Sequence, residues 1–163
     1  MTVVGICGYS RHGKDTLARA ILRAYPGAER FAFSDGIATY ARALGLMQER
    51  DPKVLQDIGY NHRIANPGVW FNVLRGSIED RDPPLAVITG IRFLDEAQLI
   101  REMGGRIVRV TRVISDGTPY VDPARDWYHE SERQIPLIQH DVEITVRDGE
   151  QDTLLRRAKE LYL

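Results

Sequence analysis

The chain has 163 residues and a formal charge of −1, with 22 basic and 23 acidic side chains. This length suits one domain, and so balanced a charge gives no sign of a nucleic-acid groove or a membrane-attracted face. The one cysteine, Cys7, excludes an internal disulfide framework. No apolar run approaches the roughly 20 residues that a membrane span needs. We therefore expect a soluble, cytoplasmic protein with a single domain over residues 1–163.

Strands and helices are expected to alternate along the chain. Short apolar and β-branched runs predict strands at residues 2–7, 30–33, 85–91, 106–112 and 142–146. Helical periodicity predicts helices from residue 14 and at 34–45, 95–105 and 151–163. Two more are expected after Asp51-Pro52 and Asn66-Pro67, where Asp or Asn would cap the helix and proline would open it. The alternation predicts an α/β fold with a parallel sheet covered on both faces.

Two segments break this rhythm. Residues 57–73 contain a polar stretch, "GYNHRIANPGVW", which we expect to be a loop that carries an arginine and ends at Trp70. Residues 113–139 are rich in Asp, Arg, His and Glu and show little regular pattern. A long irregular stretch inside a compact domain is usually functional. We expect the second segment to be a lid.

The first strand leads into a loop that nearly matches the phosphate-binding pattern G-x-x-x-x-G-K-[ST]. Backbone N–H groups of such a loop surround phosphates, and the helix that follows favours negative charge at its start. Lysine then bridges the phosphate oxygens. We therefore expect ATP to bind at Gly8, Arg11, His12, Gly13, Lys14, Asp15 and Thr16.

The loop departs from the pattern at one position. Asp15 stands where a Ser or Thr normally holds Mg²⁺, and the hydroxyl follows one residue later as Thr16. An acid in the first turn of a helix is stabilised by the helix dipole, which is one explanation. A carboxylate beside a triphosphate is tolerable when Mg²⁺ lies between them, and its oxygen is a good ligand for that ion. We favour metal contact by Asp15 and Thr16, with the Thr16 hydroxyl also available to a phosphate oxygen.

The strand at residues 85–91 ends without the acid that many P-loop proteins place there, and Arg92 follows it. The carboxyl ends of parallel strands form the ligand crevice of such sheets. Arg92 is thus suited to an acceptor phosphate or to the transferring phosphoryl group, although an ion pair with Asp95 or Glu96 is the alternative.

Several segments together resemble the deoxynucleoside monophosphate kinase family, a phage and bacterial branch of the P-loop nucleoside monophosphate kinases. They are "GYSRHGKDT", "FSDGIATYARALG", "VLQDIGYNHR", "NPGVW", "VITGIRFLDEAQLIREMGG" and "HESE". The resemblance implies a three-layer α/β/α P-loop NTPase fold with a five-stranded, mostly parallel sheet and a lid insertion. It also implies that the γ-phosphoryl group of ATP–Mg²⁺ passes to a deoxynucleoside 5′-monophosphate.

The resemblance further implies an acceptor region at about residues 34–80 and a lid at about 113–139. Arg63 and Arg92 would clamp the acceptor phosphate, and Trp70 could pack near the base or belong to the core. The implied substrate-binding residues are Ser34, Asp35, Arg63, Trp70, Arg92 and Glu132. Lys14 and Arg92 would be catalytic, and the candidates for a lid arginine that neutralises charge are Arg112, Arg125 and Arg133.

The sequence departs from the family at two places. Gly90 stands where many relatives have Asp, and "ITVRDGE" lacks the Asn that often precedes Asp-Gly, so the contact to adenine is altered. Two other functions remain open: a P-loop kinase of another phosphorylated metabolite, similar to dephospho-coenzyme A, and a regulatory NTPase. The expected partner is a small-molecule substrate, not nucleic acid or a membrane, and monomer and homodimer both stay open.

Overall fold

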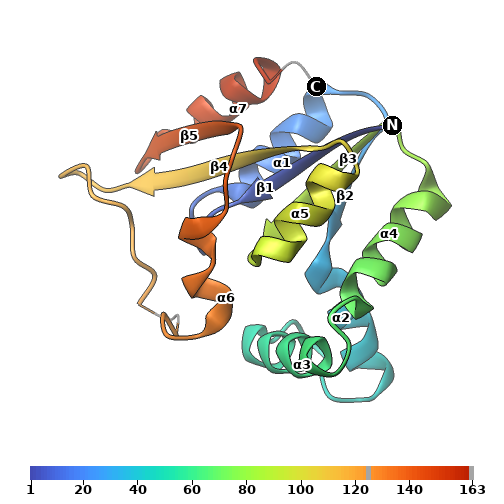
Figure 1. Ribbon diagram of the computed structural model, residues 1–163. Coiled ribbons are helices and arrows are strands. Elements are labelled where there is room, and N and C mark those ends of the chain that lie inside the picture. The colour runs from blue at the N-terminus through green and yellow to red at the C-terminus, as the bar shows by residue number, and fades with distance from the viewer. Residues whose placement is uncertain (124–125, 162–163) are drawn as a thin grey trace. The chain divides into compact units, whose positions relative to one another are not determined.

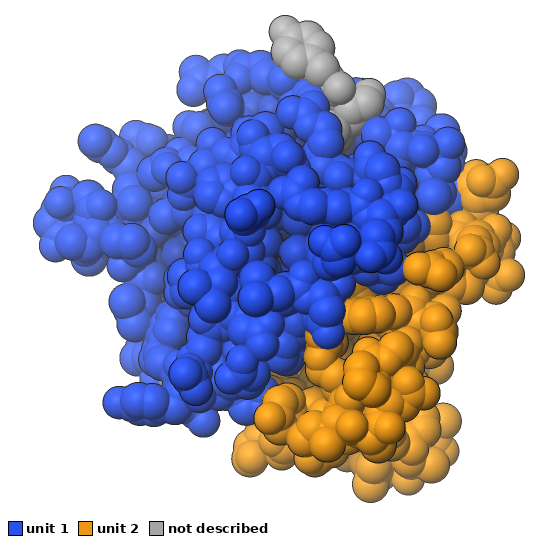
Figure 2. All heavy atoms as spheres, in the orientation of Figure 1, with its two compact units in different colours: residues 1–30, 83–163 blue, residues 31–82 orange. Residues whose placement is uncertain are grey.

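The computed structural model describes residues 1–123 and 126–161. The chain divides into two compact units, one formed by Met1–Arg30 with Pro83–Leu163 and the other by Phe31–Asp82 (Figure 2). The predicted acceptor region lies inside the second unit, which is a single uninterrupted stretch of chain.

The first unit is built on the sheet, whose strands lie in the order β2-β3-β1-β4-β5. Their bounds are β1 Thr2–Cys7, β2 Ala28–Ala32, β3 Leu85–Ile91, β4 Arg106–Val113 and β5 Val142–Arg147. All five strands are parallel, as the resemblance implied. Their carboxyl ends therefore share one edge of the sheet, which is where the phosphate loop leaves β1.

Helices cover both faces of this sheet (Figure 1). The helices of the first unit are α1 Lys14–Ala24, α5 Leu94–Glu102, α6 Glu130–Arg133 and α7 Gln151–Lys159, with a 3-10 turn at Ile135–Leu137. Helices α1 and α7 pack against one face through Leu17, Ile21 and Leu154, which contact alternate residues of the strands. Helix α5 lies on the other face. The three-layer α/β/α prediction is confirmed.

Gly5 sets how closely α5 approaches β1. A Cβ atom at this position would lie 2.4 Å from Ile91 Cδ1 and 3.2 Å from Ile100 on α5. Ile91 and Ile100 are fully buried. Because protein interiors leave no space for extra atoms, α5 can pack this closely against β1 only when residue 5 has no side chain.

The second unit begins with the last two residues of β2, Phe31 and Ala32. Its helices are α2 Phe33–Ala43, α3 Pro52–Ala65 and α4 Val69–Arg81. The prediction of a polar loop at residues 57–73 is wrong, since α3 continues to Ala65. The Asp51 carboxylate caps α3 as expected, accepting from Lys53 N at 2.8 Å and Val54 N at 3.2 Å. A capped start and an i,i+4 ion pair between Lys53 and Asp57 stabilise this helix.

Three further predictions need correction. Asn66 ends α3 instead of capping the next helix, whose N-cap is Gly68. The second strand begins two residues earlier than expected, at Ala28, and ends at Ala32 because Phe33 already belongs to α2. Residues 113–139 are not without regular structure, since they contain α6, a 3-10 turn and an antiparallel bridge between Val113 and Pro119.

No helix in residues 1–123 or 126–161 combines the length and hydropathy that crossing a membrane requires.

Candidate active site

The phosphate loop contains two glycines in backbone conformations that favour this residue. Gly8 has φ 137° and Gly13 has φ 97°, both in the region that side chains disfavour. A Cβ at Gly8 would lie 2.4 Å from the carbonyl oxygen of Val110 in β4. Arg11 also has a positive φ, 61°, which is uncommon for a residue with a side chain. The loop is thus held in a tight and unusual turn against the neighbouring strand.

Lys14 is the first residue of α1, so its ammonium group and the helix N-terminus act at the same place. The Lys14 Nζ donates to the carbonyl oxygen of Tyr9 at 2.6 Å, which holds the side chain over the loop. Gly13, the N-cap, supplies no side-chain cap to the helix. The first N–H groups of α1 and the helix dipole are therefore suited to an anion.

The loop forms one wall of a pocket with a volume of about 360 Å³. The residues that line it are Arg11, His12, Gly13, Lys14, Asp15, Thr16, Arg19, Arg112, Val146, Arg147, Asp148, Gly149 and Leu154. Five of these side chains are cationic and two are acidic. Such a concave surface, with excess positive charge beside a helix N-terminus, is suited to a polyphosphate.

Arg112, near the end of β4, lines this pocket and has contacts on several sides of its guanidinium. Its Nε donates to the carboxylate of Asp148, and its Nη1 donates to the carbonyl oxygen of Arg11 at 3.4 Å. Its guanidinium carbon lies 4.1 Å from the centre of the Tyr120 ring. The hydrogen bond with Arg112 lowers the pKa of Asp148. Three separate contacts thus fix the plane of this guanidinium.

His12 joins the phosphate loop to the chain that follows β4. Its Nδ1 accepts from Arg112 N at 3.2 Å, so Nε2 carries the proton and donates to Tyr120 O at 2.8 Å. The side chain is 1% exposed. Burial is the largest of the effects that lower its pKa. His12 is therefore a neutral, buried connector, and its side chain is satisfied within the protein.

Residues of the predicted lid contact the phosphate loop at two more points. Arg11 Nε lies 3.5 Å from a carboxylate oxygen of Asp122, whose side chain is 4% exposed. The Tyr9 and Trp127 rings meet edge to face with centroids 5.0 Å apart. Trp127 Nε1 donates to Asp122 O at 3.2 Å, so these two residues form one unit against the loop.

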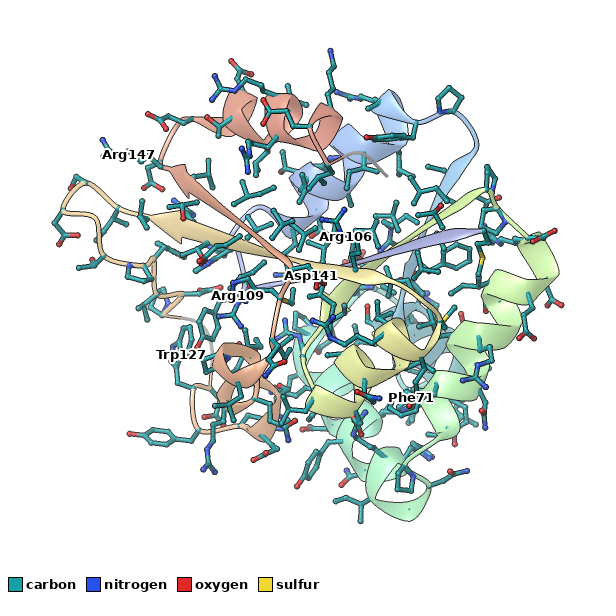
Figure 3. All side chains as sticks on the ribbon, turned by 45° about the horizontal axis from the view of Figure 1, so that its top comes forward. Phe71, Arg106, Arg109, Trp127, Asp141 and Arg147 are labelled. Carbon is teal, nitrogen blue, oxygen red and sulfur yellow. The ribbon has the colours of Figure 1, made fainter. Side chains whose placement is uncertain are left out.

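The end of the same segment is attached to the sheet and to α5. Arg92 and the fully buried carboxylate of Glu132 form an ion pair, and Gln134 Oε1 accepts from Leu94 N at 2.9 Å. Arg109 reaches from β4 toward this segment (Figure 3), where its Nη2 donates to Ile138 O at 2.6 Å. Arg92 thus forms an ion pair, which was the alternative to phosphate binding, but its partner is Glu132 and not Asp95 or Glu96.

The His129-Glu-Ser-Glu132 run explains how Glu132 reaches that position. His129 Nδ1 accepts from Ser131 N at 3.1 Å and caps α6. Glu96 contacts the backbone of Arg92, since its Oε2 accepts from Arg92 N at 2.7 Å. Backbone and guanidinium of Arg92 are thus held by two different buried carboxylates.

The residues expected to hold Mg²⁺ are two neighbouring side chains, one with a carboxylate and one with a hydroxyl. Asp15 is exposed in the first turn of α1, and the half-buried Thr16 hydroxyl accepts from Arg19 at 3.3 Å. Among the described residues, no group of three or more His, Cys, Asp or Glu side chains could hold a metal. Mg²⁺ in nucleotide sites is commonly bound through one or two protein ligands plus phosphate oxygens. Asp15 and Thr16 fit an ion that arrives with a nucleotide.

The second unit holds four of the predicted substrate-binding residues. Ser34 Oγ accepts from Arg50 at 2.9 Å, and Asp35 lies half-buried in the first turn of α2. The Arg63 guanidinium carbon lies 5.3 Å from the centre of the half-buried Phe71 ring. Trp70 is 5% exposed and therefore lies within the core of this unit.

Trp70 has a structural partner inside the second unit. Its Nε1 donates to the carbonyl oxygen of Gly59 at 3.0 Å, and its ring meets that of His62 edge to face. These contacts join α4 to α3. Of the two possibilities for Trp70, packing near the base or belonging to the core, the structure has the second. The ring of the neighbouring Phe71 is more accessible.

The three lid arginines differ in surroundings. Arg112 lies in the pocket beside the phosphate loop. Arg133 has a side chain that is 67% exposed and pairs only loosely, at 3.8 Å, with Glu130. Arg125 lies outside the described residues. Arg112 is thus the candidate that the structure brings to the loop.

Several residues of the site were missed by sequence reasoning: Tyr9, Arg19, Arg109, Tyr120, Asp122, Trp127, Arg147 and Asp148. Most reach the loop from distant parts of the chain, so no local spacing marks them. Asp148-Gly149 is the exception, because a turn pair that directly follows the last strand must lie at the same sheet edge as the phosphate loop.

Comparisons with known proteins were made on sequence and on structure. No family model and no curated protein matches the sequence. Among solved structures, shikimate kinase from Aquifex aeolicus is 14% identical with a TM-score of 0.55, covering 96% of this chain and 93% of its own. Shikimate kinase from Bacteroides thetaiotaomicron is 15% identical with a TM-score of 0.54, covering 98% and 97%.

A third structure, the tunicamycin resistance protein of Deinococcus radiodurans, is 16% identical with a TM-score of 0.52 and covers 99% of this chain and 96% of its own. Identities this low show a shared fold over nearly the whole chain. The protein has the three-layer fold that shikimate kinases also have.

Proposed function

We propose that the protein transfers the γ-phosphoryl group of ATP–Mg²⁺ to a deoxynucleoside 5′-monophosphate. The observation that carries the first half of this proposal is the phosphate loop itself, with Gly8 and Gly13 at positive φ and Lys14 opening α1. The fold shared with shikimate kinases supports a small-molecule kinase. The acceptor rests on the sequence resemblance and on the second unit.

The pocket beside the loop supports a nucleoside triphosphate as the donor. The loop and Lys14 suit the phosphates, and the pocket is also lined by Arg112, Arg147 and Asp148-Gly149, which lie outside the loop. Arginine guanidinium planes stack well on aromatic rings. We assign the phosphates to the loop and the base to the Arg112 end of the pocket.

The second unit supports an acceptor that has both a phosphate and a ring. Arg63 supplies a cationic fork suited to phosphate oxygens, and it lies over the Phe71 ring. Shikimate kinases are named for an acceptor without an aromatic ring. An arginine paired with an aromatic side chain favours the nucleotide acceptor over a non-aromatic metabolite.

The reaction would proceed by in-line attack. An oxygen of the acceptor 5′-phosphate, anionic near neutral pH, forms a bond to the γ-phosphorus as the bond to the bridging oxygen of ADP breaks. Phosphoryl transfer of this kind needs positioning and charge neutralisation more than a base. Lys14 would neutralise charge on the donor phosphates, and Arg63 would orient the acceptor. Asp15 with Thr16 would hold the magnesium ion that lowers charge on the phosphates.

The decisive experiment measures ADP release from ATP–Mg²⁺ with a panel of acceptors: deoxynucleoside and ribonucleoside monophosphates, shikimate and dephospho-coenzyme A. We expect strong stimulation by one or more deoxynucleotides, and its loss in Lys14→Ala. Lys53→Ala is the matched control, since Lys53 is exposed and pairs with Asp57 on α3.

The other outcomes identify the alternatives. Stimulation only by a different phosphorylated metabolite would keep the kinase and replace the acceptor. Slow hydrolysis that no acceptor changes would contradict the kinase proposal and favour a regulatory NTPase.

A further inference from the structure

The chain folds back on itself directly after β4. A turn around Gly117, with Ile114 N donating to Thr118 O at 2.9 Å, returns the chain so that Pro119 bridges Val113. Tyr120 then lies opposite Arg112, with Tyr120 N donating to Arg112 O at 2.8 Å. The segment from Arg112 to Tyr120 is a hairpin that ends beside the donor pocket.

In this hairpin Arg112 N does not bond directly to Tyr120 O, and the His12 side chain bridges these two atoms instead. A hydrogen-bonded antiparallel pair normally exchanges two N–H···O bonds. Here Arg112 N donates to His12 Nδ1, and His12 Nε2 donates to Tyr120 O, so the imidazole is inserted between the two strands. The phosphate loop is thereby built into the hairpin, and the backbone of Tyr120 is fixed by two bonds that do not involve its ring.

The ring of Tyr120 has a different contact. It lies 4.1 Å from the Arg112 guanidinium carbon, yet Arg112 lines the donor pocket and Tyr120 does not. Tyr120 therefore contacts Arg112 without itself lining the pocket. A cation over a ring face is attracted by the ring quadrupole, more so when partly desolvated.

We propose that Tyr120 is a positioning residue of the donor site: its ring holds the Arg112 guanidinium in the plane on which the base of the nucleoside triphosphate stacks. This inference rests on the proposed donor function. The Arg112–Asp148 ion pair alone is a weak constraint, because both side chains are substantially exposed, at 30% and 48%, and exposed ion pairs contribute little. Within the described part of the chain, the only other hydrogen bond of this guanidinium is long, from Nη1 to Arg11 O at 3.4 Å, so the ring is the contact that holds its plane.

The proposal predicts which part of the ligand senses Tyr120. Stacking uses the face of a base and not its edge, so ATP and GTP should be affected alike. Inorganic tripolyphosphate has no base and would occupy only the loop and Lys14. Loss of the ring should therefore weaken both nucleotides and leave tripolyphosphate unaffected.

The test is calorimetric titration of the full chain with ATP, GTP and tripolyphosphate, each with Mg²⁺. Tyr120→Leu removes the ring but keeps both backbone bonds of the residue, whereas Tyr120→Phe keeps the ring. We expect Tyr120→Leu to bind ATP and GTP about 5- to 20-fold more weakly, in the range of a cation–π contact, and Tyr120→Phe to bind like the wild type. Tyr128→Leu is the control, because Tyr128 lies in the same segment with 91% of its surface exposed.

Each result has one meaning. Equal nucleotide affinity in Tyr120→Leu and Tyr120→Phe would overturn the positioning role while leaving the kinase intact. A matching loss of tripolyphosphate affinity in Tyr120→Leu would also overturn it, since it would show that the loop itself has changed. A wild-type protein that binds tripolyphosphate but no nucleotide would contradict the assignment of the donor, which is a failure of the proposed function.

Discussion

The donor pocket and the second unit use different means to prepare for a ligand. The pocket is shaped by backbone: two glycines at positive φ, a helix N-terminus, and a histidine inserted between two strands. The second unit is shaped by side chains on three ordinary helices, with Trp70 in its core and Arg63 over Phe71. Charge dominates the first region and aromatic packing the second.

This difference explains why the phosphate loop of the donor pocket is easily recognised in the sequence and the ligand-binding residues of the second unit are not. A backbone site tolerates few sequences, because a side chain at Gly8 would collide with Val110 O. A site made of side chains on regular helices can change one residue at a time with the scaffold unchanged. We therefore expect substitutions in the pocket to affect every acceptor equally, and substitutions in the second unit to affect acceptors selectively.

The largest effect should come from Lys14→Ala. Removing the ammonium at the start of α1 should lower kcat by about 10²–10³-fold, the cost of losing one preorganised charge donor, and by the same factor for every acceptor. Steady-state kinetics with two acceptors measures this. A loss that depends on the acceptor would break the division between the two regions.

Arg63→Ala tests the second unit, where a substitution should affect the acceptor and not ATP. Losing one charged hydrogen-bonding partner, worth about 1.5–3 kcal/mol, should raise the KM of the acceptor about 10- to 100-fold and leave the KM of ATP unchanged. Arg75→Ala, an exposed arginine on α4, is the matched control. A rise in the KM of ATP instead would show that Arg63 serves the donor.

Trp70→Phe separates packing from binding. The ring stays largely apolar but no longer donates to Gly59 O, so the free energy of unfolding should fall by about 1–3 kcal/mol while the acceptor KM stays the same. Chemical denaturation and kinetics on the same sample measure both. An increased acceptor KM with unchanged stability would return Trp70 to the substrate-binding residues.

The smallest expected effect is the pH dependence of stability due to His12. Burial, with the nearby charges of Lys14 and Arg112, lowers its pKa below the ordinary value of 6.5, against hydrogen bonds to backbone groups that raise it. The unfolded chain then takes up a proton before the folded one does, so stability falls as the pH drops below about 6.5 and levels off below the folded pKa. The slope cannot exceed about 1.4 kcal/mol per pH unit.

Comparison with His12→Gln isolates that contribution. The amide can accept from Arg112 N and donate to Tyr120 O without titrating. Denaturation midpoints of the two proteins should therefore diverge as the pH is lowered from 7 to 5. Parallel curves would show that His12 does not cause the change.

Much of the fold was predictable because it is encoded locally. Alternating apolar runs and the glycine-lysine turn of the loop predicted the strands, the parallel sheet and α1, and the Asp51 cap was read correctly. The error at residues 57–73 arose because the polar residues of α3 face outward, so composition resembled a loop. The contacts of His12 lie about 100 residues away along the chain, where no spacing rule applies.

Because the second unit is one uninterrupted stretch of chain, it could be exchanged as a whole. The chain enters it at Phe31 and leaves at Asp82, whose φ of 42° and the two prolines that follow make a stiff exit. None of the lining residues of the donor pocket falls between these ends. A graft of residues 31–82 from a protein of the same fold would therefore exchange one complete helical module and keep every donor residue, a route by which acceptor chemistry could diversify.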